Sequence, residues 1–217
     1  MSQGQIRART AVGFTVKSGW TSAIVLAGPV TSPRVLDSQR VDLSDPANPE
    51  SRQPYHAGFA TARISGPVLS GLIASVERFG RQSVTGLIRQ YQTIEHELRG
   101  AGVVVGSLID PARIGNEHIR IHALEGRLFR GVVEDAVARN TLACSIWRER
   151  DLYGFAARMF KRPEEELRGT VAALGRGIGG TWRAEQKTAA LAAWLVLAGH
   201  APASQVAGAT TVRGTQK

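Results

Sequence analysis

The sequence has very little cysteine and no long apolar run. Cys144 is the only cysteine among 217 residues, which excludes an internal disulfide and suits a reducing compartment. The most apolar stretch, 188–198, is about half as long as the ~20 residues that a membrane span needs. The polar N-terminus is not followed by the apolar segment of a signal peptide. We therefore expect a cytoplasmic protein with no membrane partner.

Acidic residues are too few to balance the basic ones. The chain has 27 Lys and Arg against 18 Asp and Glu, with a net charge of +9 and a pI near 10.7. A basic surface attracts polyanions such as nucleic acid, and this attraction weakens steeply as salt rises. Two interpretations stay open: a contact with nucleic acid or another polyanion, or a solvated surface that keeps the protein soluble.

The length and the hydrophobic share of 43% predict one domain with one sizeable core. We find no internal repeat and no long linker. The terminal segments lack a hydrophobic pattern, so we expect a flexible N-terminus at 1–10 and a disordered tail at 200–217. The single α/β domain is then expected over 11–199.

Three short strands are predicted near the start of the domain. Residues 11–27 have the pattern of a β-hairpin, with its turn at Lys17-Ser18-Gly19. The alternation over 34–43 predicts a third strand, and the three together predict an antiparallel meander. Three prolines within 45–55 indicate a surface loop.

Helices and two more strands are predicted in the remainder. The expected helices are 67–79, 82–98, 116–139, 148–160, 163–174 and 181–197. Gly80 is expected to end the first of them, and Gly100 and Gly102 are expected to end the second. Asn116 and Thr181 are expected to cap two others. The apolar runs 103–109 and 142–147 predict central strands that are covered on both faces.

Strand–helix–strand units in the second half predict parallel pairing beside the meander. The expected fold class is therefore α/β: a mixed sheet, made of an antiparallel meander plus parallel strands, flanked by helices.

This order of elements resembles the ribonuclease H-like superfamily, and within it the Holliday-junction resolvase branch. The segment 12–20 looks like the first strand and turn of that family. Residues 118–139 are similar to the helix that follows its central strand, and 184–197 resemble its closing helix. The resemblance implies a ribonuclease H-like mixed sheet.

The sequence departs from this family at the acidic positions. Nucleases of the family gather carboxylates around two divalent ions, which clamp the attacking and leaving oxygens of a phosphodiester. The first-strand position that normally holds an aspartate is Thr15, and the run 103–109 contains no acid. Asp110 and Glu185 could hold one ion, but ligands for two are missing. The resemblance thus implies a degenerate acidic site without two-metal nuclease activity.

His118, His122 and Glu125 form the most distinctive polar set. Their spacings of four and three place them on one stripe of a helix, together with apolar residues, so we expect His122 to point inward. The three could bind a divalent metal ion, or His122 and Glu125 could act with Asp110 in acid–base catalysis. Alternatively, His122 and Glu125 are hydrogen-bonded to neighbouring strands or arginines.

Two basic segments are predicted to bind phosphate or nucleic acid. The first is the glycine loop 175–180, which carries Arg176 and precedes Arg183 near a helix start. In the second segment, 147–162, aromatic residues lie among cations. Its candidate binding residues are Arg148, Arg150, Lys161 and Arg162. The alternatives are a flexible connection for the first segment and the apolar face of a helix for the second.

Three functions remain open from the sequence. The first is a ribonuclease H-like domain that lacks two-metal nuclease activity and binds nucleic acid or another polyanionic partner. The alternative is an enzyme with a metal or acid–base site at His118, His122 and Glu125. The third is a structural component that oligomerises through apolar residues: Phe155, Met159 and Phe160.

Overall fold

A computed structural model describes residues 8–58, 61–93 and 95–201, and it contains a five-stranded main sheet. The strands are β1 (Ala8–Lys17), β2 (Trp20–Ala27), β3 (Arg34–Asp42), β6 (His96–Val105) and β7 (Cys144–Arg148). They lie in the order β3-β2-β1-β6-β7. The first three pair antiparallel, whereas β6 pairs parallel with both β1 and β7. The predicted mixed sheet is confirmed.

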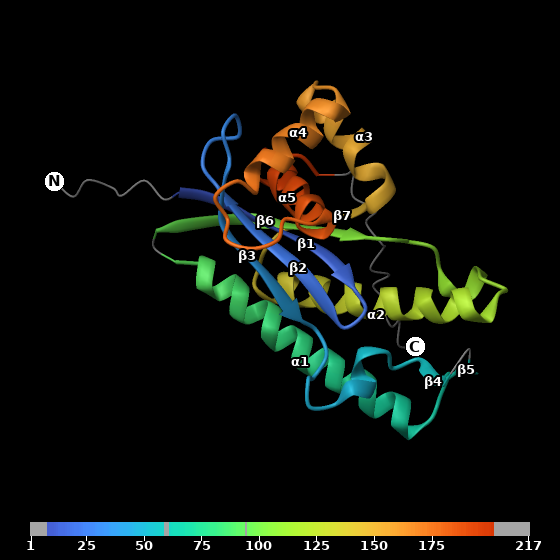
Figure 1. Cartoon of the computed structure of the whole chain (residues 1–217). Helices are drawn as coiled ribbons and strands as arrows, with labels where there is room; N and C mark the ends of the chain where they lie inside the picture. Colours follow the sequence, from blue (N-terminus) through green and yellow to red (C-terminus); the bar gives the residue numbers. More distant parts are fainter. Residues whose placement is uncertain (1–7, 59–60, 94, 202–217) are drawn as a thin grey trace, which may run out of the picture.

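Helices cover both faces of this sheet, as Figure 1 shows. The helices are α1 (Pro67–Tyr91), α2 (Glu117–Arg139), α3 (Glu149–Phe160), α4 (Glu164–Leu174) and α5 (Ala184–Leu197). α1 and α2 lie on one face, and α3, α4 and α5 lie on the other. Four short elements lie in the connections: η1 (Pro49–Arg52), β4 (His56–Gly58), β5 (Thr61–Ala62) and η2 (Pro111–Arg113).

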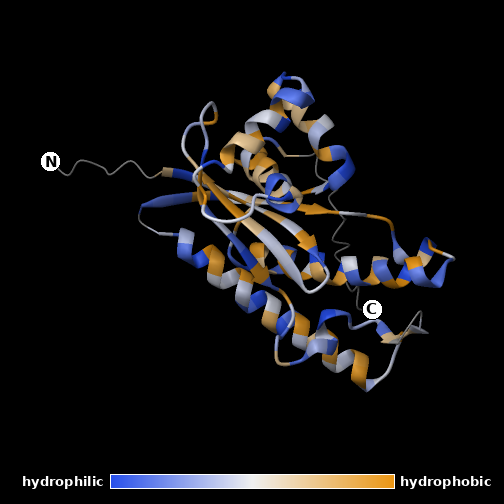
Figure 2. Cartoon of the chain, viewed as in Figure 1, coloured by the Kyte–Doolittle hydropathy of each residue, from blue (hydrophilic) through white to orange (hydrophobic). Residues whose placement is uncertain are grey.

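The alternation of side chains along the strands creates one apolar core on each face. In β1, Val12 and Phe14 point toward α1 and α2, and Ala11 points toward α5. α5 is apolar nearly all round, because it lies between the sheet and the α3–α4 pair (Figure 2). Both strand faces are therefore buried at the centre of the sheet.

Glycines in β1 and β6 let the backbone of α5 pack directly against the backbones of these strands. A Cβ atom on Gly13 would lie 1.9 Å from the carbonyl oxygen of Ala189. A Cβ atom on Gly102 would lie 2.9 Å from the carbonyl oxygen of Ala192. Gly102 thus lies inside β6, where the sequence predicted only the end of a helix. Close backbone approach is a common reason for glycine inside a strand.

The prediction that Gly80 ends a helix was wrong. α1 continues through it to Tyr91, and Gly80 is buried at the contact with α2. A Cβ atom there would lie 2.6 Å from Cγ1 of Val132. The glycine is required by helix–helix packing rather than by a helix end.

Several boundaries also differ from the predicted ones. β6 begins at His96 and ends at Val105, so residues 106–109, which were predicted to belong to the central strand, lie beyond its end. β7 is an edge strand rather than a central one. Residues 8–10, which were assigned to the flexible N-terminus, belong to β1.

Of the two predicted helix caps, one is confirmed and the other was wrong. Asn116 caps α2 as predicted, because its side chain accepts a hydrogen bond from the Ile119 backbone N–H. Thr181 does not cap α5, which starts after Arg183. The backbone N–H of Arg183 donates to Gln186 Oε1 at 2.7 Å and fixes this end instead.

In the described ranges, no helix combines the length and the apolarity needed to cross a membrane. The predicted tail lies outside these ranges except for residues 200–201, as do residues 1–7 of the predicted N-terminus.

Candidate functional site

The carboxyl ends of the parallel strands β1, β6 and β7 meet at one edge of the sheet, where open α/β sheets commonly bind ligands. We call this the carboxyl edge. Two hollows open there. The first, of about 640 Å³, lies between the β1–β2 turn, the 106–111 segment and α2. The second, of about 540 Å³, lies between the same turn, η1 and the first turn of α5.

Lys17, the last residue of β1, lines both hollows. Its Nζ lies 3.4 Å from Oε2 of Glu149 at the start of α3, with 35% of the side chain exposed. Further cations line the hollows: Arg127 and Arg130 in the first and Arg52 in the second. The sequence identified none of these four residues as a candidate, because the contacts link segments far apart in the chain.

Thr15 stands at the strand position where an aspartate was expected, and its side chain makes a contact inside the protein. Thr15 is 1% exposed, and its hydroxyl donates a hydrogen bond of 2.9 Å to the backbone carbonyl of Glu185. Its neighbour across the ladder in β6 is Val104. This pair therefore offers no carboxylate beneath the carboxyl edge.

The two acids expected to hold an ion line different hollows. Asp110 lines the first, caps η2 by accepting a hydrogen bond from the Ala112 N–H, and lies 3.9 Å from Arg127. Glu185 lines the second. Among residues 8–58, 61–93 and 95–201, no group of three or more His, Cys, Asp or Glu side chains is arranged to hold a metal ion. These residues do not fit a two-metal centre.

His118 and His122 lie together at the N-terminal part of α2. Their Nε2 atoms are 3.2 Å apart, and both rings are exposed to solvent. The prediction that the His122 ring points inward was therefore wrong. Partial burial lowers the pKa of His122, and the neighbouring rings of His118 and His56 lower it further. The His122 ring is thus biased toward its neutral form, which can bind a metal.

Glu125 is separated from this pair by its burial. It is fully buried, and its Oε1 accepts a hydrogen bond of 2.9 Å from the Tyr55 backbone N–H and lies 3.3 Å from His56 Nδ1. Its Oε2 is buried with no hydrogen-bond partner in the described part of the chain. Burial raises the pKa of Glu125 to about 7, against the effect of the Tyr55 N–H.

The stripe of His118, His122 and Glu125 is therefore split between surface and interior. The segment with η1 and β4 covers Glu125 and brings His56 beside His122, with ring centroids 5.3 Å apart. His56 was missed as a partner, since it precedes Glu125 by 69 residues.

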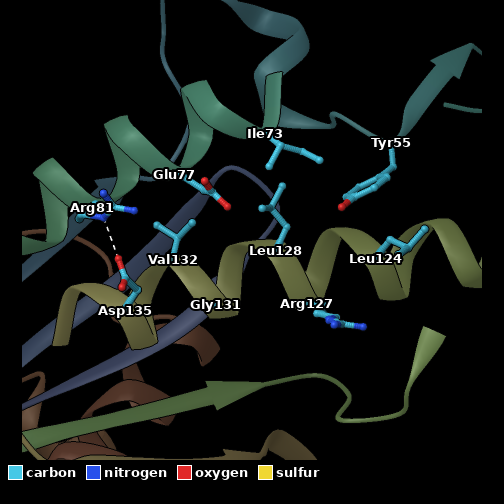
Figure 3. A pocket seen from close by; sticks show the side chains of 10 residues that line it. All are labelled: Tyr55, Ile73, Glu77, Arg81, Leu124, Arg127, Leu128, Gly131, Val132 and Asp135. Atoms are coloured by element: carbon cyan, nitrogen blue, oxygen red, sulfur yellow. Dashed lines mark hydrogen bonds and ion pairs between the residues drawn. The ribbon is translucent and has the colours of Figure 1, made fainter. Parts of the chain in front are cut away.

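A further hollow of about 620 Å³ lies between α1 and α2 (Figure 3). Tyr55 closes one end, and partial burial, together with the charge of Glu125, raises the pKa of its hydroxyl. At the other end, Arg81 and Asp135 form an ion pair of 2.7 Å between the two helices. Isoleucine, leucine and valine side chains lie between these ends, so most of this hollow belongs to the helix contact.

The predicted basic residues are divided between two places. Arg148 is the last residue of β7 at the carboxyl edge and Arg150 lies in the first turn of α3, and both form ion pairs with Asp151. Arg183 directly precedes α5 at the same edge, near the second hollow. The remaining three lie elsewhere: Lys161 and Arg162 after α3, and Arg176 in the glycine loop. Arg162 pairs with Glu166 and lies over the ring of Trp194.

The apolar patch expected on α3 is mostly covered within the chain. Phe155 packs against Trp147, and Phe160 stacks on Trp194 with ring centroids 4.5 Å apart. Met159 alone of the three is exposed. A broad apolar surface for oligomerisation is absent from this part of the described chain.

Solved structures with a similar fold include Holliday junction resolvases. RuvC of Thermus thermophilus in complex with a Holliday junction substrate has 13% identity and a TM-score of 0.53, over 89% of this chain and 98% of that chain. A second Thermus thermophilus RuvC structure has 12% identity and a TM-score of 0.53, over 88% and 98%. The yeast mitochondrial resolvase Ydc2 has 9% identity and a TM-score of 0.48, over 86% and 78%.

No family profile matches the sequence, and no curated protein sequence matches it. At the low identities of the structural matches, the likeness is one of fold. The ribonuclease H-like α/β fold predicted from the order of elements is thereby confirmed.

Proposed function

We propose that the chain is a ribonuclease H-like domain that binds nucleic acid at its carboxyl edge without two-metal cleavage. The observation that carries this proposal is the position of Lys17. Its ammonium lines both hollows of the edge, at the place where this fold commonly positions ligands. A cytoplasmic location is part of the proposal.

The charges around Lys17 favour a polyanion. Arg52, Arg127 and Arg130 line the same two hollows. Arg148, Arg150 and Arg183 lie on the segments that border them. Asp110, Glu149, Asp151 and Glu185 offset part of this charge, and the surplus stays positive. Arginine and lysine supply the phosphate contacts of most nucleic-acid interfaces.

The fold supports the same ligand class. The Thermus thermophilus RuvC structure contains a Holliday junction substrate, and that chain aligns with this one over nearly its whole length. We infer a nucleic-acid ligand from this likeness together with the basic edge. A comparison of four-way junction DNA with duplex DNA decides which shape of nucleic acid the edge prefers.

The absence of two-metal cleavage is inferred from the side chains beneath the edge. Thr15 is buried and hydrogen-bonded to the α5 backbone, and Asp110 and Glu185 face different hollows. Two-metal cleavage needs ions about 4 Å apart that share carboxylate ligands. Threonine and valine at the paired positions of β1 and β6 supply none.

The proposal is tested by fluorescence anisotropy with labelled duplex and four-way junction DNA. We expect binding that weakens as salt rises, and we expect Lys17→Gln/Arg127→Gln to weaken it by about tenfold and to lower the salt slope by about two. A control with equal loss of charge is Arg158→Gln/Arg168→Gln on α3 and α4, away from the edge. Salt-independent binding, or equal losses in both variants, would contradict the proposal.

Cleavage is tested separately with the same DNA substrates. We expect no cut product in the presence of Mg²⁺ or Mn²⁺. Metal-dependent cleavage that disappears in Asp110→Asn or Glu185→Gln would overturn the second half of the proposal and leave the first half standing.

A second candidate function is transition-metal binding by His118 and His122. The 3.2 Å between their Nε2 atoms matches the separation of about 3.3 Å expected for two imidazoles on one tetrahedral zinc ion. Glu125 is not a ligand in this version of the site, because it is buried under the β4 segment.

Calorimetric titration with Zn²⁺ tests this candidate. We expect one ion per chain, and we expect loss of that binding in His122→Ala but not in His200→Ala, which removes a histidine after α5. Unchanged zinc binding in His122→Ala would exclude the pair.

A further inference from the structure

We propose that the groove between the C-terminal halves of α1 and α2 is a second contact for the phosphate backbone of nucleic acid. This inference rests on the proposed nucleic-acid binding and extends it to another surface. The groove has a volume of about 370 Å³. Its lining residues are Arg78, Arg81, Gln82, Thr85 and Arg89 of α1, with Arg139 and Asn140 at the end of α2. We call it the arginine groove.

The arginine groove has a surplus of positive charge. Asp135 is the acid in contact with it, and this single carboxylate is shared by Arg81 at 2.7 Å and Arg139 at 2.9 Å. Arg78 and Arg89 are exposed and make no ion pair with any residue that the structure describes. The groove therefore has four guanidinium groups and one carboxylate in contact with it. The guanidinium groups of Arg78 and Arg89 are available to a ligand.

The groove is held in shape by contacts between its two helices. Asn140 Nδ2 donates hydrogen bonds to Thr85 Oγ1 at 3.2 Å and to the Ala136 carbonyl oxygen at 2.7 Å. Gly80 allows α1 and α2 to touch at Val132. Asp135 fixes a guanidinium from each helix. A ligand would therefore meet two helices that are fixed relative to each other, which lowers the entropy cost of binding.

The chemistry of the lining points to phosphates rather than to bases. Every lining side chain is a guanidinium, an amide or a hydroxyl, and none is aromatic. Base-stacking surfaces need aromatic rings, whereas guanidinium, amide and hydroxyl groups are the usual phosphate contacts. Arg78 and Arg89 are 11 residues apart on one helix, or about 16 Å, which is the length of about five phosphates along one strand.

The groove is distinct from the carboxyl edge. It lies where α2 ends, close before the amino end of β7, whereas His122 and Arg127 border the carboxyl edge from the first half of α2. In Figure 1 the C-terminal end of α1 likewise lies near the start of β6. A duplex of about 10 base pairs is as long as α2, so a longer duplex can reach both surfaces.

The test is anisotropy with a duplex of about 24 base pairs between about 50 and 300 mM salt. We expect Arg78→Gln/Arg89→Gln to lower the salt slope by about two and the affinity at about 100 mM salt by tenfold or more. The matched control is Arg34→Gln/Arg158→Gln, two exposed arginines outside the groove, which should leave the slope nearly unchanged. Circular dichroism confirms that each variant is folded.

Two results would overturn the inference. One is an unchanged slope in Arg78→Gln/Arg89→Gln, and the other is an equal loss in the control, which would reduce the effect to net charge. If Arg78→Gln/Arg89→Gln abolishes the binding of polyglutamate but leaves the binding of DNA unchanged, the groove serves an acidic protein and the inference is also wrong. Failure of the proposed function differs from all of these, because the wild-type chain would then not bind DNA even at low salt.

Discussion

The Thr15 hydroxyl donates a hydrogen bond of 2.9 Å to the backbone carbonyl of Glu185, which is 170 residues away. This contact joins β1 to the first turn of α5 directly beneath the carboxyl edge. It also explains why a threonine is compatible with the position where nucleases of this fold place a carboxylate. The hydroxyl satisfies a helix carbonyl, whereas an aspartate there would direct negative charge at that oxygen.

Replacing this hydroxyl by a methyl group should measurably destabilise the protein. We expect Thr15→Val to lower the free energy of unfolding by about 1 kcal/mol, because the side chain is buried and the Glu185 carbonyl loses its donor. Thr15→Ser retains the donor and should recover part of the loss. Urea denaturation measures both. Equal stability of Thr15→Val and wild type would contradict the role of the hydrogen bond.

The contact between β1 and α5 predicts a large difference between two glycine substitutions. Gly13→Ala should destabilise the fold by about 3 kcal/mol, because its Cβ would overlap the backbone of Ala189 and force α5 away from the sheet. Gly71 lies on the exposed face of α1 with no atom near an added Cβ. Gly71→Ala should therefore stabilise the protein by about 0.5–1 kcal/mol. Thermal and urea unfolding would show opposite shifts.

Much of the fold was predictable from local patterns. Apolar alternation identified the meander, and the run of apolar residues around Val103 identified the buried part of β6. Asn116 correctly indicated the start of α2. Glycine was the main source of error, since Gly80 and Gly102 are required by neighbours that are distant in sequence. A glycine that ends a helix and one that admits another helix look the same in a single sequence.

The candidate site was less predictable, because its contacts are long-range. Helical spacing correctly brought His118 and His122 together. It could not reveal that the segment before α1 folds over Glu125 and hides it. Lys17 was a plain turn residue in the sequence, and its importance depends on the end of β6 and on the first parts of α2 and α5, which surround it.

Buried Glu125 predicts a stability that depends on pH. Its folded pKa of about 7 lies above its ordinary value of 4.5, so burial disfavours the charged form. The stabilisation from the neutral carboxyl is fully present below about pH 4.5 and is lost as the pH rises through 7. The loss is roughly 3 kcal/mol if the whole shift is realised.

Glu125→Gln isolates this effect. The amide keeps an oxygen for the Tyr55 N–H but cannot ionise, so groups that titrate elsewhere cancel between variant and wild type. We expect the variant to gain stability relative to wild type between pH 5 and pH 8, measured by urea unfolding at each pH. A difference that stays constant across this range would show that Glu125 does not titrate there.

The ion pair between Lys17 and Glu149 predicts that nucleic-acid binding can be strengthened by one substitution. The Glu149 carboxylate lies 3.4 Å from the ammonium and competes with any phosphate that approaches it. Glu149→Gln removes this competitor and one negative charge from the carboxyl edge. We expect several-fold tighter binding to duplex DNA and a salt slope steeper by up to one, measured by anisotropy.

Glu165→Gln provides the matched control, because Glu165 is exposed on α4 and forms no ion pair with the described residues. It changes the net charge equally but is not in contact with Lys17. If both variants tighten binding by the same factor, the gain comes from net charge alone. If only Glu149→Gln does, and Lys17→Gln cancels the gain in the double variant, then Lys17 itself contacts the phosphate and Glu149 sets how strongly it does so.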